Sequence, residues 1–210
     1  MRESPARHDL FRLPLPREFF DRSVVEVARD LLGRILVRVA DDGICAGRIV
    51  ETEAYLSRND SASHSFRGPN RKNATMFLGP GLLYVYTIHA RCCMNVVTEP
   101  EGVASAVLIR AVEPLEGLEA MARRRGTTKV LDLARGPARL CEAFAVHRQF
   151  DGWDLTRGEQ IWIAACDTDP EPKDVGMSSR IGVTSAGDLK LRFFLKGNRF
   201  VSGPRRLSAG

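Results

Sequence analysis

Strand-like segments of this 210-residue chain follow one another with short turns, and helices do not alternate with them. The longest of these segments lie at 35–39, 44–55, 82–89, 94–98 and 103–113. Asp41-Asp42-Gly43 provides a turn signal between the first two, as expected of a hairpin. Consecutive strands of this kind pair antiparallel, whereas parallel sheets need helical crossovers. We therefore predict an α+β fold, with a single mixed, largely antiparallel sheet or partial barrel and flanking helices.

Helical patterns flank these strands. The first helix begins after Asp21 or Ser23, either of which can act as the N-cap, and it ends at Gly33. The remaining predicted elements are helices at 114–125 and 136–146 and short strands at 160–165, 180–184 and 189–195. Residues 1–16 are polar and contain several prolines, so we expect a flexible lead-in, followed by a single domain over residues 17–206.

The composition argues against a membrane-spanning or exported protein. No run of 18 apolar residues occurs, and the first ten residues contain no apolar stretch typical of a signal peptide. The five cysteines follow no disulfide or metal-ligand spacing, which is typical of a reducing compartment. We therefore expect a cytoplasmic protein without a membrane partner. The net charge of +5 permits a polyanionic partner, although a solvated basic surface is an alternative explanation.

The segment 48–55 reads Arg-Ile-Val-Glu-Thr-Glu-Ala-Tyr and carries two acids on one predicted strand. Strict alternation predicts two faces, one with Ile49, Glu51, Glu53 and Tyr55 and the other with Val50, Thr52 and Ala54. Two neighbouring carboxylates repel each other, so one of them is a candidate for a raised pKa, a common property of a general base. An edge strand with a solvated acidic face is the alternative interpretation.

The three tyrosines of the chain, Tyr55, Tyr84 and Tyr86, lie in one central stretch. A buried tyrosine hydroxyl needs a hydrogen-bond partner, so three of them beside two carboxylates favour a flat polar-aromatic slot for a planar heterocycle. Ordinary aromatic residues of the core are the alternative, because tyrosine is common in strands. The polar residues 56–75 form a loop long enough to have a function of its own.

Other kinds of chemistry find no support in the sequence. No glycine-rich phosphate loop and no Gly-x-Ser-x-Gly elbow occurs, so no cofactor is expected. The spacing of Glu53, His64 and His89 matches no recurring set of metal ligands, so no metal is expected. The segments 48–64 and 82–110 contain no lysine, which disfavours a covalent Schiff base.

Several motifs of the chain, which include the acids, tyrosines and histidine described above, resemble motifs of the alkyladenine (3-methyladenine) DNA glycosylase family of the type found in mammals and many bacteria. The matching segments are 48–56, His64, 76–86, 93–97, 107–119 and 136–144. The resemblance covers nearly the whole chain after the lead-in. It implies a monofunctional enzyme, a monomer associated with the nucleoid, that flips alkylated or deaminated purines out of double-stranded DNA. Such an enzyme hydrolyses the N-glycosidic bond with an activated water and leaves an abasic site; the lesions implied are 3-methyladenine, hypoxanthine and ethenoadenine.

The resemblance also implies roles for individual residues. Glu53 matches the general base, and Arg110 matches an arginine that positions the attacking water. Tyr55 and His64 match one wall of the base pocket and Tyr86 matches the opposite wall. A pocket asparagine that discriminates against the exocyclic amino group of guanine corresponds to Asn95. Glu51 matches no catalytic residue of the family, so we interpret it as structural support.

The sequence departs from the family pattern after Tyr86. The family has a tyrosine that fills the gap left by the flipped base, whereas His89 stands in that position, in a turn one residue shorter. We therefore expect a weaker wedge at His89, with Arg91 compensating through a phosphate or groove contact. Candidate phosphate contacts elsewhere are Arg123, Arg124, Arg125 and Arg139.

Two other functions remain as alternatives. A glycoside hydrolase could use Glu51 and Glu53, but such enzymes place their two carboxylates on either side of the scissile bond, and here both come from one strand. A basic module that stacks nucleotides without cutting them is the second alternative.

Overall fold

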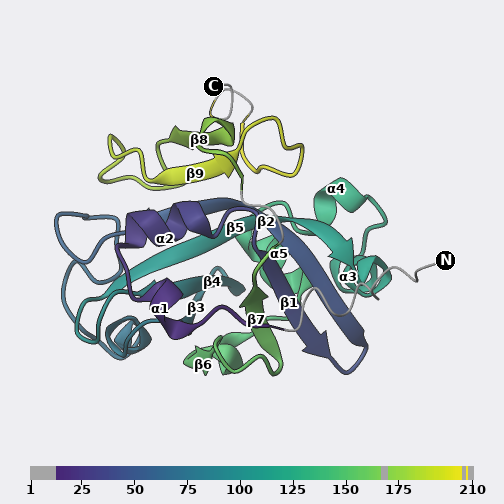
Figure 1. Ribbon diagram of the computed structural model, residues 1–210, viewed down its shortest axis with the longest axis horizontal. Helices are drawn as coiled ribbons and strands as arrows, with labels where there is room; N and C mark the ends of the chain where they lie inside the picture. The colour runs from purple at the N-terminus through teal and green to yellow at the C-terminus, as the bar shows by residue number, and fades with distance from the viewer. Residues whose placement is uncertain (1–12, 167–169, 205–206, 208–210) are drawn as a thin grey trace.

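The computed structural model describes residues 13–166, 170–204 and 207, and Figure 1 shows the arrangement of their helices and strands. The strands are β1 (Ile35–Ala40), β2 (Gly43–Tyr55), β3 (Leu82–Ile88), β4 (Arg91–Thr98), β5 (Ser105–Glu116), β6 (Trp153–Asp154), β7 (Ile161–Ala164), β8 (Val175–Ser178) and β9 (Arg192–Leu195). Within the described residues they form one sheet in the order β6-β3-β4-β5-β2-β1-β7, with β9 paired to β2 and β8 to β9. Every pairing of these strands is antiparallel, and the sheet is not closed. The predicted α+β fold is therefore confirmed.

The helices cover the sheet in two groups. They are α1 (Arg17–Phe20), α2 (Val24–Asp30), α3 (Leu118–Arg125), α4 (Val130–Leu133) and α5 (Pro137–Ala143), with the 3₁₀ turns η2 (Ala74–Phe77), η3 (Arg148–Phe150) and η4 (Pro172–Asp174). Figure 1 shows α2 along the sheet next to β9, and α3 and α4 at the opposite end of β2 and β5. The side chain of Thr52 joins α2 to β2 by donating a hydrogen bond to the Ala28 carbonyl (2.7 Å). In the described part of the chain, no helix has the length and apolarity needed to cross a membrane.

The main hydrophobic core extends along almost the whole described chain, from Leu15 to Phe193. Leu15 is only 6% exposed, and its backbone amide donates to the Ile163 carbonyl (2.8 Å). The packed part of the chain therefore begins before residue 17, whereas residues 1–12 of the predicted flexible lead-in lie outside the described residues.

Two predicted elements differ from the structure. The predicted helix over 114–125 begins only at Leu118, because Pro114 and Glu116 continue β5 and pair with Gly47 and Ala46 of β2. The predicted strand over 180–184 is wrong: this segment is irregular, and the strand of that region is β8, at Val175–Ser178. The first difference follows from pairing with β2, a strand far away in the sequence, which overrides local propensity. In the second region, the strand lies where the chain pairs with β9.

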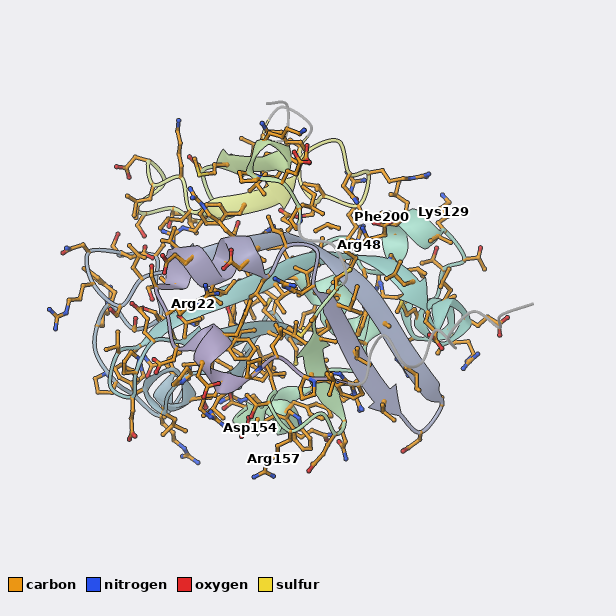
Figure 2. All side chains as sticks on the ribbon, viewed as in Figure 1. Arg22, Arg48, Lys129, Asp154, Arg157 and Phe200 are labelled. Atoms are coloured by element: carbon orange, nitrogen blue, oxygen red, sulfur yellow. The ribbon has the colours of Figure 1, made fainter. Side chains whose placement is uncertain are left out.

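The β8–β9 pair joins the main sheet through a second apolar cluster. Val50 and Ala111 of the main sheet contact Phe194 of β9 and Phe200 within this cluster. Figure 2 shows Phe200 at this junction, at the opposite end of the molecule from Asp154 and Arg157 near β6. The pair therefore brings the C-terminal part of the chain against the middle of β2.

Candidate active site

The strand β2 carries both acids, but its side chains do not alternate strictly. The pairing of β2 with β5 shifts register between Ile49 and Thr52, as a β-bulge does. Ile49 therefore belongs to the main core together with Ala54, while Val50 packs in the second cluster, which reverses the predicted places of Ile49 and Val50. Glu51 and Glu53 are both fully buried, in a strand paired on both sides. The alternative of a solvated acidic edge strand is therefore wrong.

The carboxylate of Glu53 accepts three contacts from three parts of the chain. Its Oε2 accepts a hydrogen bond from the Tyr55 hydroxyl (2.9 Å) and lies 3.1 Å from Nη1 of Arg110 on β5. Its Oε1 accepts a hydrogen bond from the Ile181 amide (2.7 Å). Burial raises the pKa of Glu53, and Arg110, the Ile181 amide and Tyr55 oppose that rise without cancelling it. A buried carboxylate with a raised pKa is suited to accept a proton near neutral pH.

Glu51 has a different set of partners. Its Oε1 accepts hydrogen bonds from Nε of Arg110 (3.0 Å) and from Nε of Arg192 (2.7 Å), and its Oε2 accepts one from the Ser202 amide (2.7 Å). Arg110 therefore joins the two acids, with Glu51 fixing one side of its guanidinium group. These contacts agree with a supporting role for Glu51. They do not support a glycoside hydrolase, because Arg110 bridges the two carboxylates of one strand, whereas such enzymes place them on either side of the scissile bond.

A cavity of about 290 Å³ is lined by Tyr55, whose hydroxyl contacts Glu53, and by the residues that follow Ile181; Glu53 itself is fully buried and contacts the cavity only through these neighbours. The lining residues of the cavity come from the loop after β2, from β3, β4 and β5, and from the irregular segment after β8; they are Tyr55, Ser61, Ala62, His64, Met76, Tyr84, Tyr86, Ile88, Asn95, Ala106, Gly182, Val183, Thr184 and Ser185. The fold thus brings together all four predicted pocket residues, Tyr55, His64, Tyr86 and Asn95. Tyrosine rings and one amide in a narrow cavity are suited to bind a flat polar ring.

The aromatic walls of the cavity are arranged differently from the prediction. The ring of His64 lies edge-on against that of Tyr86, with centroids 4.5 Å apart and planes at 78°. His64 therefore packs with Tyr86 and does not face it across the cavity. Nδ1 of His64 is hydrogen-bonded to the Tyr84 hydroxyl (2.9 Å), and burial lowers the pKa of His64. The histidine is consequently neutral at physiological pH.

The polar loop 56–75 is ordered by hydrogen bonds of its own side chains. The Asp60 carboxylate accepts hydrogen bonds from the amides of Leu56 (3.0 Å) and Ala62 (3.2 Å). Nδ2 of Asn73 donates to the His64 carbonyl (2.8 Å), which fixes the backbone beside the histidine ring. The long loop predicted to be functional therefore places His64 at the cavity.

Asn95 and the tip of the β3–β4 hairpin form the remaining parts of the site. The Asn95 side chain donates to the Tyr84 carbonyl (3.1 Å) and is nearly fully buried. His89 and Ala90 adopt positive φ values of 46° and 61°, which is typical of a two-residue hairpin turn. His89 and Arg91 are both exposed there, and the neighbouring Ile88, 50% exposed, lines the cavity. Sequence reasoning missed Ile88, whose isoleucine is ordinary for a strand.

The basic helix α3 lies away from this site. Ala46 pairs with Glu116 just before α3, whereas Tyr55 is nine residues further along β2, a distance of about 30 Å at ~3.3 Å per residue. Arg123 and Arg124 pair with Asp42, and Arg125 pairs with Glu142. Arg139 pairs with Asp132 in the same region. These arginines are therefore neutralised in part by neighbours at the far end of the sheet.

Sequence reasoning also missed the segment after β8. Gly182, Val183, Thr184 and Ser185 line the cavity, and the Ile181 amide contacts Glu53. The sequence contains no signal for the contact with Glu53, because it is made by a backbone amide, a group that every residue except proline carries.

A tyrosine-lined cavity whose residues contact a buried carboxylate, on an open antiparallel sheet, is the arrangement expected of an enzyme that binds a planar ring and uses a carboxylate as a base. Residues 18–199 match the family described as Methylpurine-DNA glycosylase (MPG). The chain belongs to this family: it is a DNA-3-methyladenine glycosylase, a hydrolase of N-glycosyl bonds that acts in DNA repair.

Several relatives carry the provisional name 3-methyladenine DNA glycosylase. A protein of Mesorhizobium japonicum is 44% identical over 195 residues, which are 92% of each chain. A protein of Burkholderia lata is 47% identical over 90% of this chain and 91% of its own. One of Methanoculleus marisnigri is 45% identical over 90% of this chain and 99% of its own. The resemblance inferred from the motifs is therefore confirmed.

Proposed function

We propose that the enzyme flips alkylated or deaminated purines out of double-stranded DNA into the cavity next to Glu53. A base inside a duplex cannot be reached, so a glycosylase must extrude it. Stacking against an aromatic ring contributes about 1–3 kcal/mol per base and offsets part of the cost of unstacking. Tyr55 and Tyr86 supply such rings, and their electron-rich faces favour a cationic alkylated base. The contacts of Glu53 beside the cavity are the observation that carries the proposal.

In the proposed reaction Glu53 accepts a proton from a water molecule, which attacks the sugar carbon and displaces the base. Its raised pKa increases its basicity, and Arg110 keeps it oriented and positions the water. Asn95 excludes guanine by a clash with the exocyclic amino group. For neutral lesions such as hypoxanthine, the neutral ring of His64 provides a hydrogen bond to the leaving base. The chain acts as one catalytic domain, predicted over residues 17–206 and extended at its start by the packed Leu15, and as a monomer on DNA that uses no cofactor or metal.

The direct test is an excision assay on duplexes that each carry one lesion. We expect release of 3-methyladenine, hypoxanthine and ethenoadenine, and no release of normal guanine. Strand cleavage should follow only after heat or alkali, because hydrolysis leaves an intact backbone at an abasic site. If none of these lesions is released, the assignment of this cavity to alkylated and deaminated purines is wrong, and binding without excision becomes the better account.

We further propose that the exposed tip of the β3–β4 hairpin enters the duplex, with His89 as a weak wedge and Arg91 as a phosphate contact. Arg91→Ala should lower excision from duplex DNA by about tenfold at moderate salt and reduce the salt slope of binding by about one, because one counterion fewer is released. His89→Ala should have a smaller effect. Arg157→Ala, at the β6 end of the molecule in Figure 2, serves as the matched control.

Two further outcomes would change these roles. If His89→Ala has no effect and Arg91→Ala abolishes duplex excision without changing excision from single strands, Arg91 is itself the wedge. If neither substitution changes excision or salt dependence, the hairpin tip does not enter the DNA.

A further inference from the structure

A buried ion pair joins the polar loop to the segment after β8. The guanidinium group of Arg180 donates two parallel hydrogen bonds to Asp60, from Nη1 to Oδ2 and from Nη2 to Oδ1, both 2.6 Å long. The side chains of both residues are fully buried. Burial opposes ionisation of Asp60, but hydrogen bonds from Arg180 and from the Leu56 amide lower its pKa below the usual range. Both partners are therefore charged at neutral pH.

Arg180 contacts the active site in two further ways although it does not line the cavity. Its guanidinium group lies 4.5 Å from the centroid of the Tyr55 ring, and its Nη1 donates to the Ala54 carbonyl (3.0 Å). The next residue, Ile181, gives its amide to Glu53, and the residues after it line the cavity. Arg180 therefore begins the backbone segment that contacts Glu53 and lines the cavity.

We propose that Asp60 and Arg180 form a positioning pair, which fastens the 180–185 segment to β2 and so holds the Ile181 amide against Glu53 and the Tyr55 ring beside the cavity. This inference deepens the proposed function and rests on it. Neither residue touches the reacting atoms, so both act through Glu53 and Tyr55.

The chemistry of the pair favours arginine over any other cation. A guanidinium group is flat, so it can form two parallel hydrogen bonds with a carboxylate and stack on a ring at the same time, whereas lysine offers only a point charge. Burying a charged pair is costly, and apolar residues of similar volume often stabilise a fold equally well. A buried ion pair this close to the proposed general base therefore fits a role in the geometry of the site better than a role in stability alone.

The decisive variant is Arg180→Lys, which keeps the charge opposite Asp60 but loses the paired hydrogen bonds and the stacking on Tyr55. We expect the single-turnover rate of excision to fall by about 100-fold, because a displacement of about 1 Å at a catalytic group has this effect. The acid limb of the pH–rate profile should also move to higher pH. The Ile181 amide stabilises ionised Glu53, so losing it raises the pKa of Glu53 further.

The titratable and charged residues that face Glu53 keep their identity in this variant, although Tyr55 loses its stacking partner. They are Glu51, Tyr55, Tyr86, Cys93, Arg110 and the cross-strand neighbour Arg192. The matched control is Arg29→Lys, since Arg29 also stacks over an aromatic ring, that of Phe193 (5.2 Å), but lies outside the site. Its pH–rate profile should match that of the wild type.

A titration of the Glu53 carboxyl by NMR, in protein labelled at glutamate side chains, separates this inference from the proposed function. A higher pKa in Arg180→Lys than in the wild type supports the positioning pair even if the enzyme releases none of the lesions tested. An unchanged pKa and an unchanged acid limb overturn the inference even if excision slows, since the pair is then only structural. If Arg180→Lys does not fold, Asp60→Asn, which keeps the shape of the partner, is judged by the same two measurements.

Discussion

Glu53→Gln will lower single-turnover excision of a damaged purine by about 100- to 10,000-fold, the usual contribution of a general base. Glutamine keeps the shape of the side chain and an acceptor for the Ile181 amide, but it cannot take a proton from water. Binding of lesion-containing duplex should change little, because the aromatic walls of the cavity are untouched. The measurement is base release with enzyme in excess over DNA, so that product release does not limit the rate.

Glu113→Gln is the matched control for this substitution, since Glu113 is a half-buried strand glutamate of β5 that contacts Asn198 and lies outside the cavity. Its excision rate should equal that of the wild type. If Glu53→Gln releases bases as fast as the wild type, the water is activated by another group and the proposed mechanism is wrong.

The second large effect concerns stability. Arg192→Met will lower the free energy of unfolding by about 3–5 kcal/mol, the usual result of removing one partner of a buried ion pair. Glu51 and Arg192 are both fully buried, and Arg192 also donates to the carbonyls of Ser202 (3.0 Å) and Leu207 (2.9 Å). Methionine fills part of the space of the arginine side chain, but Arg110 is then the one arginine of this pair that still contacts Glu51. Denaturant unfolding at neutral pH measures the difference.

Two further variants check the origin of this loss. Arg157→Met, in which the arginine is 64% exposed and 3.9 Å from Asp154, should change the free energy of unfolding by less than about 1 kcal/mol. The double variant Glu51→Gln with Arg192→Met should recover part of the stability, because the uncompensated charge is gone. A loss below about 1 kcal/mol for Arg192→Met would mean that water reaches Glu51 and replaces the arginine.

Much of the fold follows from local patterns. The hairpin of β1 and β2 and the runs that became β3, β4 and β5 were predictable, because their alternation and turns lie within short stretches of sequence. The bulge in β2, the strand at 175–178 and the irregular segment 180–185 were not. The bulge and the irregular segment depend on partners far away in the sequence, and the bulge alone was enough to exchange the places of Ile49 and Val50. The strand at 175–178 forms by pairing with β9, which its own residues do not indicate.

The site shows the same division. Glu53, Tyr55, His64, Tyr86 and Asn95 carry side chains whose chemistry and family motif could be recognised, and the fold gathers them around one cavity and its acid. The roles of Asp60, Arg180 and the Ile181 amide could not be predicted from the sequence. An aspartate in a turn and an arginine in an irregular segment are ordinary in any sequence, and only the folded structure shows that they form an ion pair next to Glu53.

The contacts that complete the site join parts of the chain far apart in sequence. Glu53 meets the Ile181 amide across 128 residues, and Glu51 meets Arg192 across 141 and the Ser202 amide across 151. Closing such long loops costs more entropy than closing a hairpin, so we expect these contacts to form after local hairpins such as β1–β2. A chain that has folded its central hairpins but has not yet docked β9 would thus hold the acids without their partners. We therefore expect the complete active site to form only at a late stage of folding.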